Sequence, residues 1–296
     1  MGGGRKIKIA VIGGDRREEV LVEILAERGF KLSVLSDRPL KGPGLFISSN
    51  IEQVVRNADV VIAPMSSTDE EGYLKNTFVE ERIQLNSGFF NLLNKNVLFL
   101  IGFANPLLKK ILEDNGINYI ELSRLDDLAI LNAIPTAEAA IKIAIEETDI
   151  TLASSNILVY GLGKVGLSLA WRLKALGANT FAVTRDGAAI ARGKDLGIEM
   201  LTYDSVKTYL PDMDIIFNTV PALVIDKESI ALLKEAALII DLASSPGGTD
   251  FSAARERGIK AILAPGLPGK TAPVTAGKIL ADLIPDLINS YSGLNH

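Results

Sequence analysis

The stretch Val159-Tyr-Gly-Leu-Gly-Lys-Val-Gly166 decides the fold class of this chain. Its glycines have the spacing G-x-G-x-x-G, with an apolar run (NILVY) before them and another (VGLSLAWRLKALG) after them. In such a strand–turn–helix the first glycine permits a tight turn, the second lets the backbone approach a pyrophosphate, and the third allows close packing. The helix N-terminus then offers unpaired N–H groups to the phosphates. The stretch predicts a dinucleotide site, the alternative being a glycine-rich turn without a ligand. The residues assigned to the site are Gly161, Gly163, Lys164, Val165 and Gly166.

The next strand ends in Val183-Thr-Arg-Asp186, where dinucleotide sites often carry a lone acidic residue. Thr184 and Arg185 instead offer a hydroxyl and a guanidinium, which suit a 2′-phosphate. The sequence therefore favours NADP over NAD, with Arg192 and Lys194 near enough in sequence to assist. In the alternative interpretation Arg185 faces solvent and Asp186 binds the ribose, as expected for NAD.

Two series of alternating strands and helices run along the chain. The first predicts strands at 6–12, 31–35, 59–64, 97–101 and 117–121, and the second at 156–160, 180–184, 214–218, 237–243 and 259–263. Continuous apolar strands separated by helices are typical of parallel sheets covered on both faces. The predicted fold class is α/β, with two Rossmann-like doubly wound parallel-sheet domains and an interdomain cleft.

The domain boundaries follow from the same pattern. We expect an N-terminal Rossmann-like substrate domain over 1–130 and a linker helix within 131–150, which Pro135 opens. An NAD(P)-binding Rossmann domain is expected over 151–274. A C-terminal helix over 275–296 should pack back on the first domain, and Pro285 should bend or end it.

Composition excludes several classes of site. The 296 residues include no Cys and a single His, His296, so thiol chemistry, disulfides and Cys/His zinc sites are excluded and no metal is expected. The net charge of −5 argues against nucleic acid. With no apolar run of roughly 18 residues and no signal peptide, a cytoplasmic protein without a membrane partner is expected. Catalysis must use Asp, Glu, Lys, Tyr, Ser or Thr, or a cofactor, and no catalytic residue is assigned.

Two other stretches imitate nucleotide sites. Gly13-Gly14-Asp15 follows the first strand, but Arg16 and its neighbours replace the third glycine. Gly269-Lys270-Thr271 ends like a phosphate-binding loop, but Ala264 stands where that loop needs a glycine. The first is better explained as a substrate-binding or structural turn, and neither predicts a second nucleotide.

Ligands of doubly wound sheets bind beyond the carboxyl ends of the strands. One such loop, expected to meet the nicotinamide ribose, is Asn218, Thr219, Val220 and Pro221. Other strand ends carry hydroxyls and cations that could hold an anionic substrate, although each could also be an ordinary loop residue. These candidates are Arg16, Ser66, Ser67, Ser244, Ser245 and Lys270.

Six stretches together resemble the A subunit of bacterial dipicolinate synthase over essentially the whole chain. They are VIGGDRR (11–17), PMSS (64–67), NAIPTAEAAI (132–141), VYGLGKVG (159–166), DLASSPGGTDF (241–251) and APGLPGKTAPVTAG (264–277). The resemblance implies NAD(P)-dependent oxidation of dihydrodipicolinate, from the lysine branch, to dipicolinate (pyridine-2,6-dicarboxylate) during sporulation. It also implies a partner, the flavoprotein-like B subunit of dipicolinate synthase, and a homo-oligomer is compatible with it.

Two other functions stay open at this point. One is NADP-dependent dehydrogenation of another small hydroxy or keto acid, which would need a Lys/Asp pair that the sequence does not place. The other is a noncatalytic subunit that binds NADP.

Overall fold

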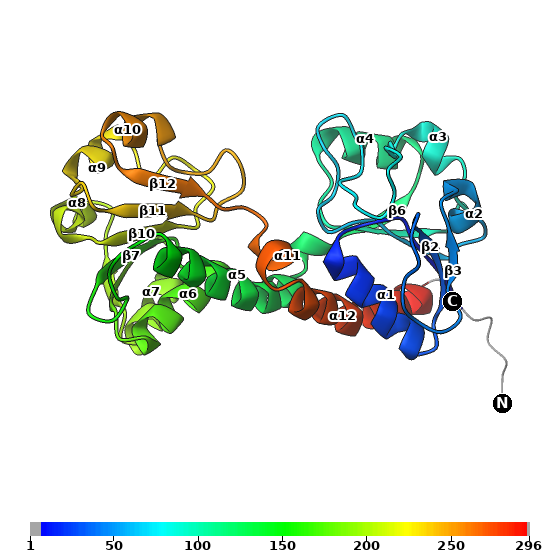
Figure 1. Cartoon of the computed structure of the whole chain (residues 1–296), viewed down its shortest axis with the longest axis horizontal. Coiled ribbons are helices and arrows are strands. Elements are labelled where there is room, and N and C mark those ends of the chain that lie inside the picture. The colour runs from blue at the N-terminus through cyan, green and yellow to red at the C-terminus, as the bar shows by residue number, and fades with distance from the viewer. Residues whose placement is uncertain (1–6, 295–296) are drawn as a thin grey trace. The chain divides into compact units, whose positions relative to one another are not determined.

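The computed structural model describes residues 7–294, without the side chains of 292–294. Lys6, where the first predicted strand begins, and His296 lie outside the described residues. The chain forms two compact units, with divisions after Ala129 and after Thr271, and the last segment belongs to the first unit (Figure 1).

The first unit contains a six-stranded parallel sheet in the order β3-β2-β1-β4-β5-β6. Its strands are β1 (Lys8–Val11), β2 (Lys31–Leu35), β3 (Phe46–Ser48), β4 (Val60–Ile62), β5 (Leu98–Ile101) and β6 (Asn118–Glu121). Its helices are α1 (Arg16–Glu27), α2 (Ile51–Val55), α3 (Ser87–Phe90), α4 (Pro106–Asp114) and α12 (Pro273–Leu294). This strand order is that of the Rossmann fold.

The second unit repeats the same topology. Its parallel sheet has the order β12-β11-β10-β7-β8-β9, which is the first order with each strand number raised by six and read from the other edge. The strands are β7 (Asn156–Tyr160), β8 (Asn179–Val183), β9 (Glu199–Leu201), β10 (Ile215–Asn218), β11 (Leu238–Asp241) and β12 (Lys260–Leu263). The helices are α5 (Asp126–Glu146), which begins in the first unit, α6 (Lys164–Ala175), α7 (Gly187–Asp195), α8 (Val206–Tyr209), α9 (Lys227–Leu232), α10 (Phe251–Glu256) and α11 (Leu267–Thr271). Two Rossmann-like domains are thereby confirmed.

Both faces of each sheet are buried. On β5, Leu98 belongs to the core of one face and Phe99 to that of the other. Ile216 and Phe217 divide in the same way on β10. Successive side chains of a strand point to opposite faces, so a strand that is buried on both sides must be apolar throughout. This is why continuous apolar runs in the sequence located the central strands.

Helix α12 packs against α1 within the first unit (Figure 1). Gly277 lets the two helices approach, because a Cβ atom there would lie 2.5 Å from the carbonyl oxygen of Arg17. Ile284 and Ile288 are buried in the core that α1 covers. The helix continues through Pro285 to Leu294, so the expectation that this proline ends it is wrong. Burial of Ile284 and Ile288, which flank the proline, offsets the free-energy cost of the hydrogen bond that proline cannot donate.

Helix α5 begins at Asp126 rather than at Pro135 and continues through this proline. The hydroxyl of Thr136 donates to the carbonyl of Asn132 at 2.6 Å within the turn that the proline interrupts. By length and composition alone α5 could cross a membrane. A stripe of its alanines, which includes Ala137 and Ala144, is fully buried in the core of the second unit.

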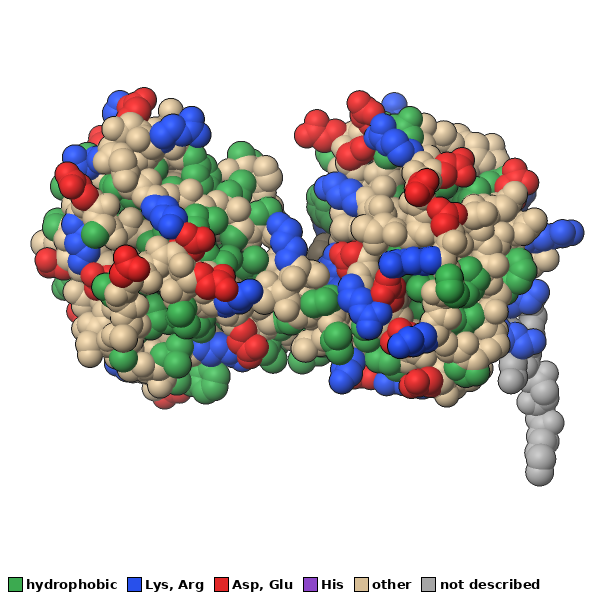
Figure 2. Space-filling view, in the orientation of Figure 1, with side chains coloured by type: hydrophobic (Ala, Val, Ile, Leu, Met, Phe, Trp, Pro, Cys, Tyr) green, Lys and Arg blue, Asp and Glu red, His purple; other side chains and the backbone are tan. Residues whose placement is uncertain are grey.

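Acidic and basic side chains are interspersed on the face of the molecule that Figure 2 shows. That face therefore has no extended basic surface of the kind that binds a phosphate backbone.

Candidate functional site

The three fingerprint glycines have three different local roles. Gly161 has a φ of +83°, a conformation that side chains disfavour, and a Cβ there would lie 2.5 Å from Thr219 Oγ1. A Cβ on Gly166 would lie 1.9 Å from the carbonyl oxygen of Gly161, so this glycine is needed where α6 crosses the end of β7. A Cβ on Gly163 would meet no atom within 4 Å. The backbone at Gly163 therefore faces open space, as a pyrophosphate site requires.

The N-cap position of α6 is held by a glycine. Gly163 is the N-cap residue and supplies no side-chain hydrogen bond to the helix. The first N–H groups of a helix have no partner within the helix and carry partial positive charge. An uncapped N-terminus at a glycine turn is a suitable phosphate site.

The corresponding turn of the first unit differs in this respect. Asp15 caps α1, and its carboxylate accepts from the N–H of Arg17 at 2.9 Å while Glu18 accepts from the N–H of Asp15 at 2.9 Å. A Cβ on Gly13 would lie 2.5 Å from the Asn76 side chain, and one on Gly14 would lie 2.5 Å from Glu18. Two carboxylates and an amide thus occupy the volume and the N–H groups that a pyrophosphate would use.

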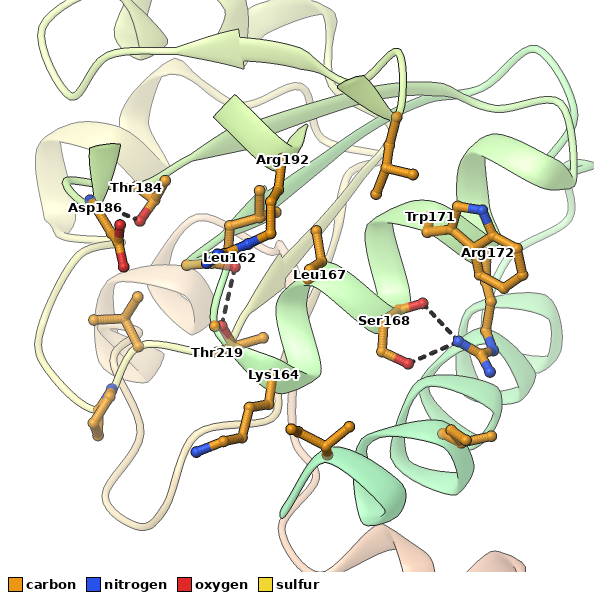
Figure 3. Close-up of a pocket in the computed structure, with 17 residues that line it drawn as sticks. Leu162, Lys164, Leu167, Ser168, Trp171, Arg172, Thr184, Asp186, Arg192 and Thr219 are labelled. Atoms are coloured by element: carbon orange, nitrogen blue, oxygen red, sulfur yellow. Dashed lines mark hydrogen bonds between the residues drawn. The ribbon is translucent and has the colours of Figure 1, made fainter. Parts of the chain in front are cut away.

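A cavity of about 1030 Å³ surrounds the α6 turn within the second unit (Figure 3). This volume is at the upper end of the roughly 300–1,000 Å³ that is usual for small-molecule sites. Most of the predicted cofactor residues line it, namely Gly161, Gly163, Lys164, Thr184, Thr219, Val220 and Pro221. Val165, Gly166, Arg185 and Asn218 do not.

Thr184, Asp186 and Arg192 line one end of the cavity, where β8 ends and α7 begins. The carboxylate of Asp186 caps α7 and accepts from the N–H groups of Ala188 at 2.8 Å and Ala189 at 3.1 Å. It is therefore engaged within its own turn. The guanidinium of Arg185 lies 4.8 Å from the centre of the Tyr203 ring and is not part of the lining. Arg192 lines the cavity, as do Lys164 and Arg172 on α6.

The loop after β10 is held by a buried polar network. Asn218 is completely buried, and its side chain accepts from the N–H of Val220 at 2.9 Å and donates to the Val220 carbonyl at 3.0 Å. It also donates to the carboxylate of Asp241 at 3.0 Å. Burial makes the Asn218 side chain a support for this loop, and the assignment of Asn218 to the cofactor site stays a prediction.

Asp241 is fully buried and forms no ion pair with any residue in the described range 7–294. Besides Asn218 it accepts from the N–H of Ala243 at 3.0 Å, the N–H of Gly248 at 2.8 Å and the hydroxyl of Thr249 at 2.7 Å. These donors compensate the buried charge and fix the loop after β11 relative to the loop after β10.

The predicted substrate residues fall into two sets, one in each unit. In the second unit Ser244 and Ser245 are exposed beyond the end of β11, and Lys270 is exposed on α11. Their side chains make no hydrogen bond or ion pair among the residues that the structure describes, and none of them lines the cavity.

In the first unit the candidates are engaged locally. Ser66 donates to the Lys75 carbonyl at 2.8 Å, and Ser67, which is buried, donates to the Phe103 carbonyl. Arg16 is exposed and paired with Glu19 at 2.6 Å, so its charge already has a partner. The prediction of a substrate site shared by both units stays a prediction.

Glu18 is the unusual ionisable group at this edge of the first unit. Burial raises the pKa of its carboxyl to about 7, against the lowering effect of the Arg17 charge and of hydrogen bonds from backbone N–H groups. Besides Asp15, it accepts from the N–H of Met65 at 2.8 Å. Glu18 thus joins the loops after β1 and β4. Sequence reasoning missed it because a Glu in a first helical turn usually lies in solvent.

Sequence reasoning also missed the apolar end of the cavity. Ile130 and Ile134 from α5 line it together with Leu167 and Trp171 from α6. Both pairs have helical i,i+4 spacing, so each helix could have been predicted to present them on one face. The sequence did not show that the two faces adjoin.

The fold and this site define a class, namely a two-domain protein with a nicotinamide-dinucleotide-binding Rossmann domain of the dehydrogenase type. Residues 138–246 match the family of the D-isomer specific 2-hydroxyacid dehydrogenase NAD binding domain. A transhydrogenase from Sinorhizobium meliloti shares the overall fold, with a TM-score of 0.69 at 15% identity over 95% of this chain and 94% of its own.

Closer relatives narrow the class. Residues 8–123 match the family of the N-terminal domain of the dipicolinate synthase A subunit. The chain is 36% identical to the dipicolinate synthase A subunit of Bacillus subtilis (strain 168), over 95% of this chain and 96% of that protein. The crystal structure of the Bacillus halodurans A subunit superposes with a TM-score of 0.91 at 36% identity, over 97% of this chain and 99% of that one. The chain belongs to the family of dipicolinate synthase A subunits, as the sequence resemblance predicted.

Proposed function

We propose that this chain oxidises dihydrodipicolinate to dipicolinate and transfers a hydride to NADP⁺. The observation that carries the proposal is the uncapped N-terminus of α6 at Gly163, which opens into a large cavity in a chain of this family. Its substrate would be a cyclic dicarboxylate, and a proton would leave as the ring becomes aromatic. Consistent with the family resemblance, we place the reaction in sporulation, in the cytoplasm, with the flavoprotein-like B subunit of the synthase as partner.

The chain's own groups would hold the pyrophosphate and the nicotinamide half of the cofactor. Backbone N–H groups at Gly163 and Lys164 would bind the pyrophosphate. Thr219 Oγ1 donates to the Tyr160 carbonyl at 2.9 Å, and this bond keeps the loop up to Pro221 against the cavity, where it would bound the nicotinamide half. The cofactor supplies the hydride-accepting carbon, and the protein supplies orientation and exclusion of water.

The preference for NADP rests on the residues at the end of β8. Asp186 accepts the two capping N–H groups of α7 through Oδ1, which leaves only Oδ2 for a ribose 2′-hydroxyl. Thr184 and Arg192 offer the cavity a hydroxyl and a guanidinium, a combination that suits a 2′-phosphate. Arg192 thus takes the role that the sequence suggested for Arg185.

Substrate carboxylates need cations or amide groups once they leave water, because unpaired buried charge is costly. Lys270, with Ser244 and Ser245, supplies a positive charge and hydroxyls at the carboxyl edge of the second sheet. These three side chains have no competing partner among the described residues, which favours them over Arg16, Ser66 and Ser67.

The test is turnover by the purified chain of enzymatically generated dihydrodipicolinate with NADP⁺, with and without the flavoprotein-like partner. Dipicolinate formed in equal amount with NADPH by the chain alone is the expected result. A matched Lys270→Met variant should have a KM for the dicarboxylate at least about tenfold higher, with NADPH affinity unchanged. NADPH binding without turnover, even with the partner present, would instead indicate a noncatalytic nucleotide-binding subunit.

A further inference from the structure

An apolar surface on α5 and α6 is not used by the core of the second unit. Ile130 and Ile134 on α5 are 55% and 37% exposed, and Trp171 on α6 is 47% exposed. Leu131, beside them on α5, is 38% exposed. Ile130, Ile134 and Trp171 line the cavity, and Figure 3 shows Trp171 at the end opposite Thr184 and Asp186. We call this set the α5–α6 face.

The exposure of these residues is not required by the fold. The stripe of α5 that packs into the unit consists of small residues, with Ala133, Ala137, Ala140 and Ala144 almost completely buried. The isoleucines lie beside this stripe on the helix, four residues apart on one side of it, and are exposed. Clustered large apolar side chains on a surface commonly mark a protein–protein contact.

Each helix of the α5–α6 face carries one charged side chain, Glu138 on α5 and Arg172 on α6, that forms no ion pair within residues 7–294. Beside Trp171, the guanidinium of Arg172 lies 5.2 Å from the indole ring centre and donates only to Ser168, to its carbonyl at 3.0 Å and its hydroxyl at 2.7 Å. Glu138 is exposed one turn beyond Ile134, and in residues 7–294 the structure gives it neither an ion pair nor a hydrogen bond. Arg172 likewise has no carboxylate partner within that range.

We propose that the α5–α6 face is the interface between two copies of this chain. In a twofold contact the same surface meets itself, so a residue on α6 of one copy meets a residue on α5 of the other, and the reverse. Trp171 of each copy would pack between Ile130 and Ile134 of the other. Arg172 would pair with Glu138 across the interface, and this pair would occur twice.

A second copy fits this face better than other occupants do. The surface contains both halves of a complementary contact, with an aromatic and a cation on α6 and aliphatic side chains and an anion on α5. A lipid surface would gain nothing from Glu138, since anionic headgroups repel it. Buried interfaces are enriched in Trp and Arg anchors of this kind.

The charge pair gives the sharpest test. Sedimentation of the full chain over a range of concentrations should show a species of twice the 31.7 kDa chain mass. Arg172→Glu and Glu138→Arg should each weaken dimerisation by at least about tenfold, because each places like charges opposite one another twice. The double variant should regain most of the lost affinity. Leu232→Ser, an exposed leucine on α9, should leave the dimer unchanged.

Trp171 provides an independent measurement, because it is the only tryptophan of the chain. Its emission should shift to longer wavelength on dilution as the indole becomes exposed, and Arg172→Glu should show the shifted emission at all concentrations. A monomer at every concentration, or single charge reversals that do not weaken the dimer, would overturn the proposal. So would a double variant no better than the singles, or emission that changes only with anionic vesicles or with the flavoprotein-like partner. None of these measurements requires turnover, so the result is independent of the proposed oxidation.

Discussion

Replacing Gly163 by Asp should separate folding from nucleotide binding. Gly163 has extended backbone angles (φ −72°, ψ −162°) that any residue adopts, and a Cβ there meets nothing within 4 Å. Asp is also a preferred N-cap residue, and a carboxylate at a helix N-terminus is favourable. The free energy of unfolding should therefore stay the same or rise by up to about 1 kcal/mol.

The same carboxylate should abolish dinucleotide binding. The carboxylate would accept hydrogen bonds from the N–H groups at the start of α6 and would lie within roughly 4 Å of the pyrophosphate. One pair of like charges at that distance costs about 4 kcal/mol at an effective dielectric constant near 20. Allowing for screening by salt, we expect NADPH affinity to fall at least about 100-fold, or about 2.7 kcal/mol.

Calorimetric titration with NADPH and urea unfolding measure the two quantities on one preparation. Energy transfer from Trp171, which lines the same cavity, to bound NADPH provides a second binding signal. Gly166→Ala is the matched contrast. Its Cβ would lie 1.9 Å from the Gly161 carbonyl oxygen, so it should lower the free energy of unfolding by roughly 1–3 kcal/mol. A Gly163→Asp variant that binds NADPH within about threefold of the original would refute the assignment of this turn.

Three further predictions concern charged groups. Arg192→Gln should weaken NADPH binding by about 1.5–3 kcal/mol and leave NADH binding unchanged. Arg185→Gln should weaken NADPH binding by a smaller amount. If calorimetry shows the larger loss for Arg185→Gln, then Arg185 and not Arg192 binds the 2′-phosphate. Asp241→Asn should lower the free energy of unfolding by about 3 kcal/mol, because an amide cannot accept from all the surrounding donors, and denaturation showing no loss would contradict this. Glu18 has a folded pKa of about 7, above its unfolded value, so its contribution to stability is full below about pH 4.5 and is lost as pH rises to about 7. Between about pH 4.5 and pH 7 the free energy of unfolding of the original chain should therefore fall relative to that of Glu18→Gln, by at most about 3 kcal/mol. Urea midpoints of the two chains that differ by the same amount at pH 5 and at pH 8 would count against the raised pKa.

The central strands could be predicted from sequence because a strand buried on both faces has no polar position. LFLI at 98–101 and LII at 238–240 are such runs, and both lie in central strands of the structure. The edge strands β3 and β9 were missed, since an edge strand buries less and FIS or EML carries no distinctive pattern. Helices α2, α3, α8 and α9 are only four to six residues long and show no helical periodicity.

The candidate site was predictable where local geometry alone determines it. The roles of Gly161, Gly163 and Gly166 follow from one turn, and the structure gives each a distinct environment. The direction of a long side chain was not predictable. Arg185 and Arg192 both follow β8, but Tyr203, which is distant in sequence, provides the ring over which Arg185 lies. Asn218 was placed in the right loop, but its burial depends on Asp241 in the next strand.

The two units have the same strand order, yet only one of them has a turn that could bind a dinucleotide. Both turns carry glycines after a central strand, so glycine content does not distinguish them. The N-cap residue does, because the carboxylates of Asp15 and Glu18 accept from N–H groups at the start of α1, whereas Gly163 supplies no side-chain cap to α6. An internal anion at a helix N-terminus excludes an external one, by charge as well as by volume. In the first unit the side chains of Asp15, Glu18 and Asn76 together occupy the turn where a dinucleotide would bind, which leaves this unit for another role.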